Sequence, residues 1–200
     1  MKEISEITSQ KKGDRLNVFI DGEFAFGVEY QTAVKFGLKI GRCLSQKEID
    51  DIQLEEGNVA AFNRALKYAV KKTVSEKQMR EYLKKHGYND IAIDIAIDKL
   101  KEYSYLGDDK FASAYVCTYS GARGQRRLQM ELKNAGVEQD IIDEALAGKD
   151  DTIACLSCIE KYKRTHKEVD RQKLTAYLAY RGFDYDDISY CIARSERDED

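Results

Sequence analysis

The segment MREYLKKHGY, at residues 79–88, is the clearest indication of the fold, because the chain repeats its pattern twice more. The further copies are LQMELKNAGV at residues 128–137 and LTAYLAYRGF at residues 174–183. In each copy an apolar residue is followed four positions later by leucine, and four positions after that by glycine. Gly87, Gly136 and Gly182 thus stand 49 and then 46 residues apart. A spacing of this size predicts a repeated structural unit.

The agreement continues on both sides of the three copies. Upstream, Phe62 and Ala65 match Phe111 and Ala114. Downstream, apolar residues recur in phase: Ala92, Ile93, Ala96 and Ile97, then Ile141, Ile142, Ala145 and Leu146, then Ile188, Cys191 and Ile192. Apolar residues three and four positions apart indicate amphipathic helices, and a glycine is typical of a helix C-terminus. We therefore expect three tandem three-helix units that stack into an elongated right- or left-handed array.

The N-terminal part has a different pattern. Two apolar runs, Leu16–Ile20 and Glu23–Val28, flank the pair Asp21-Gly22, which is typical of a type I′ hairpin turn, and Ile4–Ile7 is a candidate third strand. The predicted fold class is therefore mainly α, with a small N-terminal β-hairpin/α extension, and the absence of proline fits a helical chain. The expected domains are the extension at 1–57 and helical repeats at 58–107, 108–150 and 151–200.

Local signals predict where individual helices begin and end. Ser45 and Glu48 form a capping-box pattern that opens a short helix ending near Gln53, with a boundary at 55–57. Asn58 is then expected to cap the first helix of the first repeat. A second capping box starts at Ser75, and Asp108 is a candidate N-cap for the helix that opens the second repeat.

Charge alternates along the repeats, although the formal net charge of the chain is only −3. Residues 64–85 hold eight basic residues against two acidic ones, and residues 86–109 hold six acidic residues against two basic ones. The same alternation follows in the other copies, with net charges of +3 at 123–133, −5 at 134–151, +5 at 161–181 and −5 at 184–200. Regular stacking would place the basic segments along one edge and the acidic segments along another.

These basic segments are the predicted partner-binding surface. Its candidate contact residues are Lys71, Lys72, Lys84, Lys85, Arg123, Arg126, Arg127, Arg171, Lys173 and Arg181. The alternative is that they are ordinary solvated side chains, some of them near helix C-termini where the helix dipole favours cations. That alternative does not account for Arg123, Arg126 and Arg127, which precede or open a helix.

The sequence offers little that would support catalysis. Cys155 and Cys158 have the spacing of half a metal site, but no second such pair exists, and we interpret them as buried helix residues. The glycines of Gly121–Gly124 are expected to permit a sharp turn between helices. The chain contains two histidines, and most of its thirteen tyrosines are interpreted as core residues. We predict no enzyme activity, no catalytic residue, no metal, no cofactor and no small-molecule substrate.

Composition and the N-terminus predict a cytoplasmic protein. No stretch approaches the roughly 18 apolar residues that span a bilayer, so no membrane association is expected. The start, MKEISEITSQKK, lacks the apolar region of a secretory signal. Five cysteines, an odd number, are interpreted as reduced thiols.

The repeat residues resemble those of the RecX family of regulatory proteins over residues 58–194. The resemblance is carried in the second repeat by YLGDDKFA at 105–112, by GQRRLQMEL at 124–132 and by Gly136-Val137. The first repeat is similar through Ala65-Leu66, Ser75-Glu76, Leu83 and Gly87-Tyr88, and the third through Lys173-Leu174, Tyr177–Ala179 and Arg181–Phe183. The N-terminal hairpin resembles an extension that some members carry.

The resemblance implies a cytoplasmic, non-enzymatic modulator of the RecA recombinase that regulates DNA repair and homologous recombination, including the SOS response. Members bind RecA and its filament on single-stranded DNA, and they usually limit filament growth, strand exchange and ATP hydrolysis. Whether DNA is contacted directly is left open, as is the sign of regulation. Two alternatives use the same residues: a direct nucleic-acid-binding protein, and a helical-repeat adaptor for an unrelated protein partner.

Overall fold

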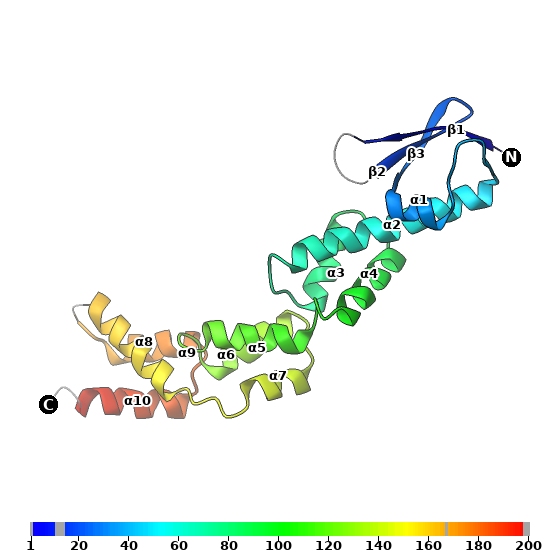
Figure 1. The fold of residues 1–200 in the computed structure, drawn as a ribbon. Coiled ribbons are helices and arrows are strands. Elements are labelled where there is room, and N and C mark those ends of the chain that lie inside the picture. The colour runs from blue at the N-terminus through cyan, green and yellow to red at the C-terminus, as the bar shows by residue number, and fades with distance from the viewer. Residues whose placement is uncertain (1, 11–14, 167, 198–200) are drawn as a thin grey trace. The chain divides into compact units, whose positions relative to one another are not determined.

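The structure is a computed structural model that describes residues 2–10, 15–166 and 168–197 (Figure 1). The chain divides into two compact units. The first comprises residues 1–72 and 79–105, and the second comprises residues 73–78 and 106–200.

The first unit begins with a four-stranded antiparallel sheet in the order β3-β2-β1-β4. The strands are β1 (Lys2–Ser9), β2 (Arg15–Ile20), β3 (Glu23–Glu29) and β4 (Cys43–Leu44). Asp21 and Gly22, between β2 and β3, both have positive φ angles, of 51° and 86°. This is the conformation that a type I′ turn requires, so the predicted hairpin and the third strand are confirmed.

Two helices flank β4 along the chain, α1 (Tyr30–Lys35) before it and α2 (Gln46–Ala69) after it. The predicted capping box opens α2: the Glu48 N–H donates to Ser45 Oγ at 3.2 Å, and Glu48 Oε2 accepts the Ser45 N–H at 2.8 Å. The predicted helix end near Gln53 is wrong, because α2 is 24 residues long and continues without a break through residues 55–57. Asn58 is buried in the middle of this helix and is not its N-cap.

Polar residues inside α2 explain why the sequence suggested a boundary there. Glu56 is buried against the sheet, where its Oε2 accepts the Glu29 N–H at 2.8 Å and its Oε1 lies 2.8 Å from Arg15 Nη2. The polar segment therefore fastens the helix to the end of β3, and it does not interrupt the helix.

Three three-helix repeats make up the rest of the fold, as predicted. The first is formed by α2, α3 (Glu76–Lys85) and α4 (Asp90–Glu102), the second by α5 (Asp108–Tyr119), α6 (Gln125–Asn134) and α7 (Gln139–Leu146), and the third by α8 (Thr152–Thr165), α9 (Arg171–Tyr180) and α10 (Tyr185–Arg197). Leu83, Leu132 and Leu178, the leucines of the repeated pattern, are fully buried.

The repeated glycines end the second helix of each repeat. Gly87, Gly136 and Gly182 have φ angles of 83°, 88° and 87°. Only glycine adopts this left-handed conformation without strain, so each glycine stops its helix and reverses the chain. The predicted role of all three is confirmed.

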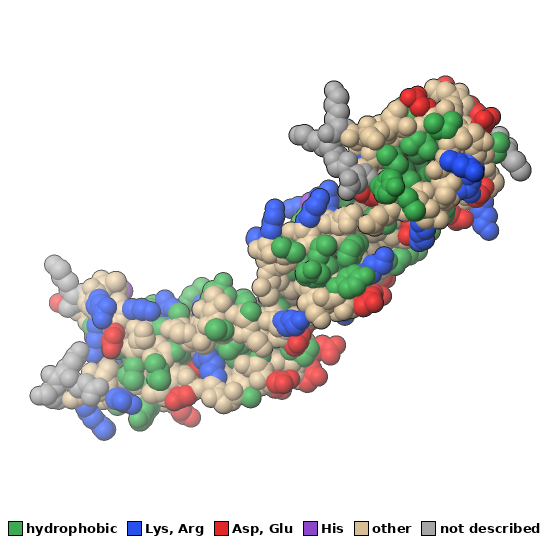
Figure 2. Space-filling model, viewed as in Figure 1, with side chains coloured by type: hydrophobic (Ala, Val, Ile, Leu, Met, Phe, Trp, Pro, Cys, Tyr) green, Lys and Arg blue, Asp and Glu red, His purple; other side chains and the backbone are tan. Residues whose placement is uncertain are grey.

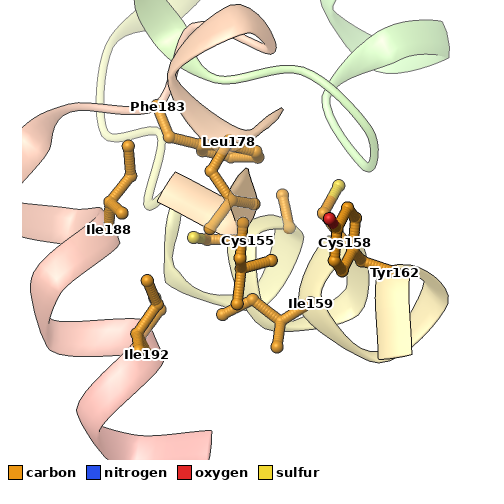
Figure 3. Packing of buried hydrophobic residues seen from close by; sticks show 11 residues of the cluster. Cys155, Cys158, Ile159, Tyr162, Leu178, Phe183, Ile188 and Ile192 are labelled. Atoms are coloured by element: carbon orange, nitrogen blue, oxygen red, sulfur yellow. The ribbon is translucent and has the colours of Figure 1, made fainter. Parts of the chain in front are cut away.

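The core of the third repeat contains the cysteine pair (Figure 3). Cys155 extends from α8 toward Ile188 of α10, whereas Cys158 Sγ lies 3.9 Å from the Ala122 carbonyl oxygen, and both cysteines are fully buried. Burial raises the pKa of the Cys155 thiol well above its ordinary value. The interpretation of these cysteines as buried core residues is confirmed. Among the described residues, no helix is long and apolar enough to cross a bilayer.

Candidate protein-binding surface

Seven of the ten predicted contact residues are exposed at the surface. They are Lys71, Lys72, Lys84, Lys85, Arg126, Arg171 and Lys173. Lys84 Nζ lies 3.7 Å from Asp90, Arg171 lies 3.9 Å from Glu196, and Arg126 pairs with Asp184. Within the described part of the chain, the other four have no ion-pair partner. On the face that Figure 2 presents, acidic side chains gather over α7, the third helix of its repeat.

Arg123 is not a free surface cation. Its Nη1 donates to Glu131 Oε2 at 2.7 Å and to the Tyr115 hydroxyl at 2.8 Å, and its guanidinium lies 3.9 Å from the centre of the Tyr119 ring. The side chain therefore joins α5 to α6, and its donors are directed into the protein.

Arg127 and Arg181 join the second repeat to the third. Arg127 Nε donates to Glu131 Oε1 at 2.9 Å, and its Nη1 donates to the Tyr180 carbonyl at 3.2 Å. Arg181 Nη1 donates to the Ala122 carbonyl at 2.9 Å. These two arginines hold the end of α9 against the start of α6.

Glu131 organises this network, although it was not among the residues predicted from the sequence. Burial alone would raise the pKa of its carboxyl, but hydrogen bonds from Arg127 and Tyr115 and the charges of Arg123 and Arg127 bring the pKa below its ordinary value. Glu131 follows Arg127 by four residues, and this spacing on one helix could have predicted the ion pair between them.

The contacts between successive repeats recur at equivalent positions. Ser75 Oγ donates to the Ala135 carbonyl at 2.6 Å, and the Gly124 N–H donates to the Arg181 carbonyl at 2.9 Å. In both cases the residue before a second helix contacts the C-cap residue of the next repeat's second helix. Gly124 is needed here because a Cβ would lie 2.3 Å from the Gly182 carbonyl oxygen. Close packing, rather than a sharp turn, therefore explains this glycine.

Aspartates at the start of one repeat cap the second helix of the repeat before it. Asp108 Oδ1 accepts the Glu76 N–H at 2.8 Å, and Asp151 Oδ2 accepts the Gln125 N–H at 2.8 Å. The prediction that Asp108 caps its own helix is wrong, because Gly107 is the N-cap of α5 and Asp108 is its first residue.

The interpretation of most tyrosines as core residues is also wrong. The exposed tyrosines are Tyr30, Tyr103, Tyr105, Tyr119, Tyr180, Tyr185 and Tyr190. The Tyr119 ring lies beside Arg123 and the Tyr180 ring beside Arg127, so aromatic side chains accompany two of the predicted contact residues. No cluster of His, Cys, Asp or Glu among the described residues could hold a metal ion.

Family models match four stretches of the chain. They are described as the regulatory protein RecX N-terminal domain, matching residues 2–45, and as the first, second and third three-helix domains of RecX, matching residues 61–100, 108–146 and 154–192. These matches extend over the sheet and all three helical repeats.

Whole proteins are similar as well. The regulatory protein RecX of Bacillus licheniformis is 33% identical over 210 residues, which cover 100% of this chain and 80% of that protein. The regulatory protein RecX of Bacillus velezensis is 35% identical over 207 residues, covering 98% and 79%. The one from Caldanaerobacter subterraneus subsp. tengcongensis is 31% identical and is covered to 98% of its length.

Two solved structures share the fold. A crystal structure of regulatory protein RecX superimposes with a TM-score of 0.76 at 23% identity, covering 96% of this chain and 100% of that one. The crystal structure of RecX from Lactobacillus salivarius superimposes with a TM-score of 0.62 at 21% identity, covering 70% and 97%.

Proposed function

Because the chain belongs to the RecX family of regulatory proteins, we propose that it binds the RecA recombinase and modulates the RecA filament on single-stranded DNA. The match to relatives named regulatory proteins over nearly the whole chain is the observation that carries this proposal. In this proposal the protein is a cytoplasmic regulator without catalytic activity of its own.

Exposed cations would make the first contacts with the filament. Lys71 and Lys72 follow α2, Lys84 and Lys85 end α3, and Lys173 stands in the first turn of α9. Long-range attraction by such side chains accelerates association and favours one orientation of the partner. Arg123, Arg127 and Arg181 support this surface by holding its helices together, and they are not proposed as contacts.

Regulation then follows from differential affinity. A protein that binds one state of a partner more tightly than another shifts the partner toward the bound state. We propose that binding limits filament growth, strand exchange and ATP hydrolysis, and thereby regulates recombination and the SOS response.

DNA-dependent ATP hydrolysis by the cognate RecA, with and without this protein, tests the proposal. We expect the rate to fall as the protein is added in increasing amounts. An unchanged rate, together with no binding to filaments on single-stranded DNA, would contradict the proposed function.

Charge reversal tests the contact residues. Lys71→Glu with Lys72→Glu should weaken filament binding, whereas Lys39→Glu with Lys47→Glu makes the same change of charge at exposed positions outside the repeated basic segments. Equal weakening by both double variants would reject the assignment of Lys71 and Lys72.

Binding to bare single-stranded DNA distinguishes the proposed function from the main alternative, a protein that binds nucleic acid directly. A protein that acts by binding DNA alone would bind it with an affinity that falls with salt, at a logarithmic slope of about −0.7 per phosphate neutralised. We expect binding to the filament to be much tighter than binding to the bare strand.

A further inference from the structure

A groove of about 400 Å³ lies in the second unit, between the start of α6, the end of α9 and the start of α10. Its wall includes Met130, Tyr180, Tyr185 and Ile188, which are mostly apolar. These elements are held in place by the Arg127 and Arg181 contacts, so the groove is part of the fixed junction between the second and third repeats.

The large side chains of this groove face solvent. Met130, Tyr180 and Tyr185 are 56%, 77% and 69% exposed. Leaving such side chains in water gains nothing for the fold, because burying apolar surface is what stabilises it. Tyrosine, methionine and arginine are also the residue types enriched at the centres of protein–protein interfaces.

Charges of both signs border the groove. Arg126, whose side chain is 70% exposed, stands on one side and pairs with Asp184 on the other. Asp186 and Asp187 follow in the first turn of α10. A nucleic-acid backbone would be repelled by this acidic group, whereas a protein segment carrying both signs would not.

We infer that this groove is an anchor site for the recombinase, which inserts one large apolar side chain between Met130 and Tyr185. A carboxylate beside that side chain would replace Asp184 at the guanidinium of Arg126, and a cation would replace Arg126 at Asp184. The inference rests on the proposed function, because it names the place on this chain where the filament is held. It differs from the basic segments in chemistry, since most of the binding free energy here comes from apolar burial.

Paired serine substitutions test the anchor. Tyr185→Ser with Met130→Ser removes the apolar wall, and both residues are exposed, so the fold should be retained. The matched control is Tyr190→Ser with Ile153→Ser, which removes an aromatic and an aliphatic side chain that are 56% and 78% exposed and do not line the groove. Circular dichroism and thermal melting establish that both variants fold like the parent protein.

Binding to RecA filaments on single-stranded DNA is measured for the parent and both variants. We expect the groove variant to bind about thirtyfold more weakly, which corresponds to the roughly 2 kcal/mol typical of an interface centre. We expect the control variant to bind like the parent protein.

The outcomes separate the two proposals. If the parent protein does not bind the filament, the proposed function fails and the anchor fails with it. If the parent binds and the groove variant binds equally well, the anchor is overturned and the proposed function stands. If the groove variant keeps filament binding but loses binding to bare single-stranded DNA, the groove is a nucleic-acid site and the anchor is likewise overturned.

Discussion

Glu131 accepts hydrogen bonds from Arg123, Arg127 and Tyr115. Among the described residues, none of these three side chains forms a hydrogen bond or an ion pair with any other carboxylate. Ion pairs at the surface contribute little, but a partly buried carboxylate with three donors is different. Its loss would leave two guanidinium groups without their acceptor in a partly desolvated position.

Glu131→Gln should lower the free energy of unfolding by about 1–3 kcal/mol. The matched control is Glu160→Gln, which removes the carboxylate of an exposed pair with Arg164 on the same unit and should cost less than about 0.5 kcal/mol. Denaturant unfolding of both variants measures the difference. Equal effects of the two substitutions would contradict the role given to Glu131.

The contribution of Glu131 should also depend on pH. Its pKa is lower in the folded protein than in the unfolded chain, so folding favours the ionised carboxylate. This stabilisation is complete above the pKa of an ordinary glutamate, about 4.3, and is lost as the pH falls through the lowered pKa. The difference in stability between the parent and Glu131→Gln should therefore shrink on acidification. A difference that stays constant would show that charge is not its origin.

At this scale the sequence predicted less than at any other. The sequence shows that Arg123, Arg127 and Arg181 lie in basic segments, but the tertiary fold determines which residues they contact. Arg181 contacts the carbonyl of Ala122, 59 residues earlier, and no local pattern shows that pairing. The pair of Arg127 with Glu131, four residues apart on one helix, is the exception that spacing alone could have found.

At the scale of elements, α2 shows how a polar segment can mislead. Glu55, Glu56 and Gly57 look like a linker because they are polar and contain glycine, yet Glu56 is buried against the sheet. Helix ends were predictable where a capping box or a glycine with positive φ stands, as at the starts of α2 and α3 and at the ends of α3, α6 and α9.

Gly57→Ala tests the continuity of α2. The glycine lies inside the helix without a positive φ, and no described atom outside the helix's own backbone lies within 4 Å of the position of an added Cβ. Alanine should therefore stabilise the protein by roughly 0.5–1 kcal/mol. Thermal melting measures the gain, and a loss of stability would indicate that the chain bends at this residue.

Gly124→Ala tests the junction between the second and third repeats. The new Cβ would lie 2.3 Å from the Gly182 carbonyl oxygen, so the two repeats must move apart, and a loss of several kcal/mol is expected. Gly121→Ala is the matched control. Apart from the two residues next to Gly121 in the chain, no described residue has an atom within 4 Å of the position of its added Cβ. Calorimetry of the two variants should show destabilisation by the first substitution alone. Similar melting of both would mean that the junction tolerates the added methyl group.

At the scale of the whole molecule, the repeat predicted most of the fold. Three glycines in phase with three buried leucines were enough to predict three-helix units, because a period of nearly 50 residues leaves few other architectures. The alternation of charge was equally visible. Its expected result, basic segments aligned along one edge of an elongated array, stays a prediction.

Salt should weaken binding to the filament if exposed cations guide it. Raising the salt concentration from about 0.1 M to about 1 M shortens the Debye length from about 10 Å to about 3 Å, which screens charges such as Lys71 and Lys72. The affinity of the parent protein should therefore fall across this range, and that of Lys71→Glu with Lys72→Glu should fall less steeply. Titrations at several salt concentrations measure both slopes, and parallel slopes would exclude these two lysines.

The aspartates at the repeat junctions have a consequence for rebuilding such a protein. Asp108 and Asp151 each complete a helix that belongs to the preceding repeat, whereas Asp170 caps α9 of its own repeat through the N–H groups of Gln172 and Lys173. A first or second repeat that is cut out at its loops would thus lose the carboxylate that the next repeat supplies to cap its second helix. In chimeras that exchange repeats between relatives, the junction should therefore lie after the aspartate that caps the preceding repeat. The third repeat can be placed last without modification, because its second helix is capped by Asp170 of the same repeat.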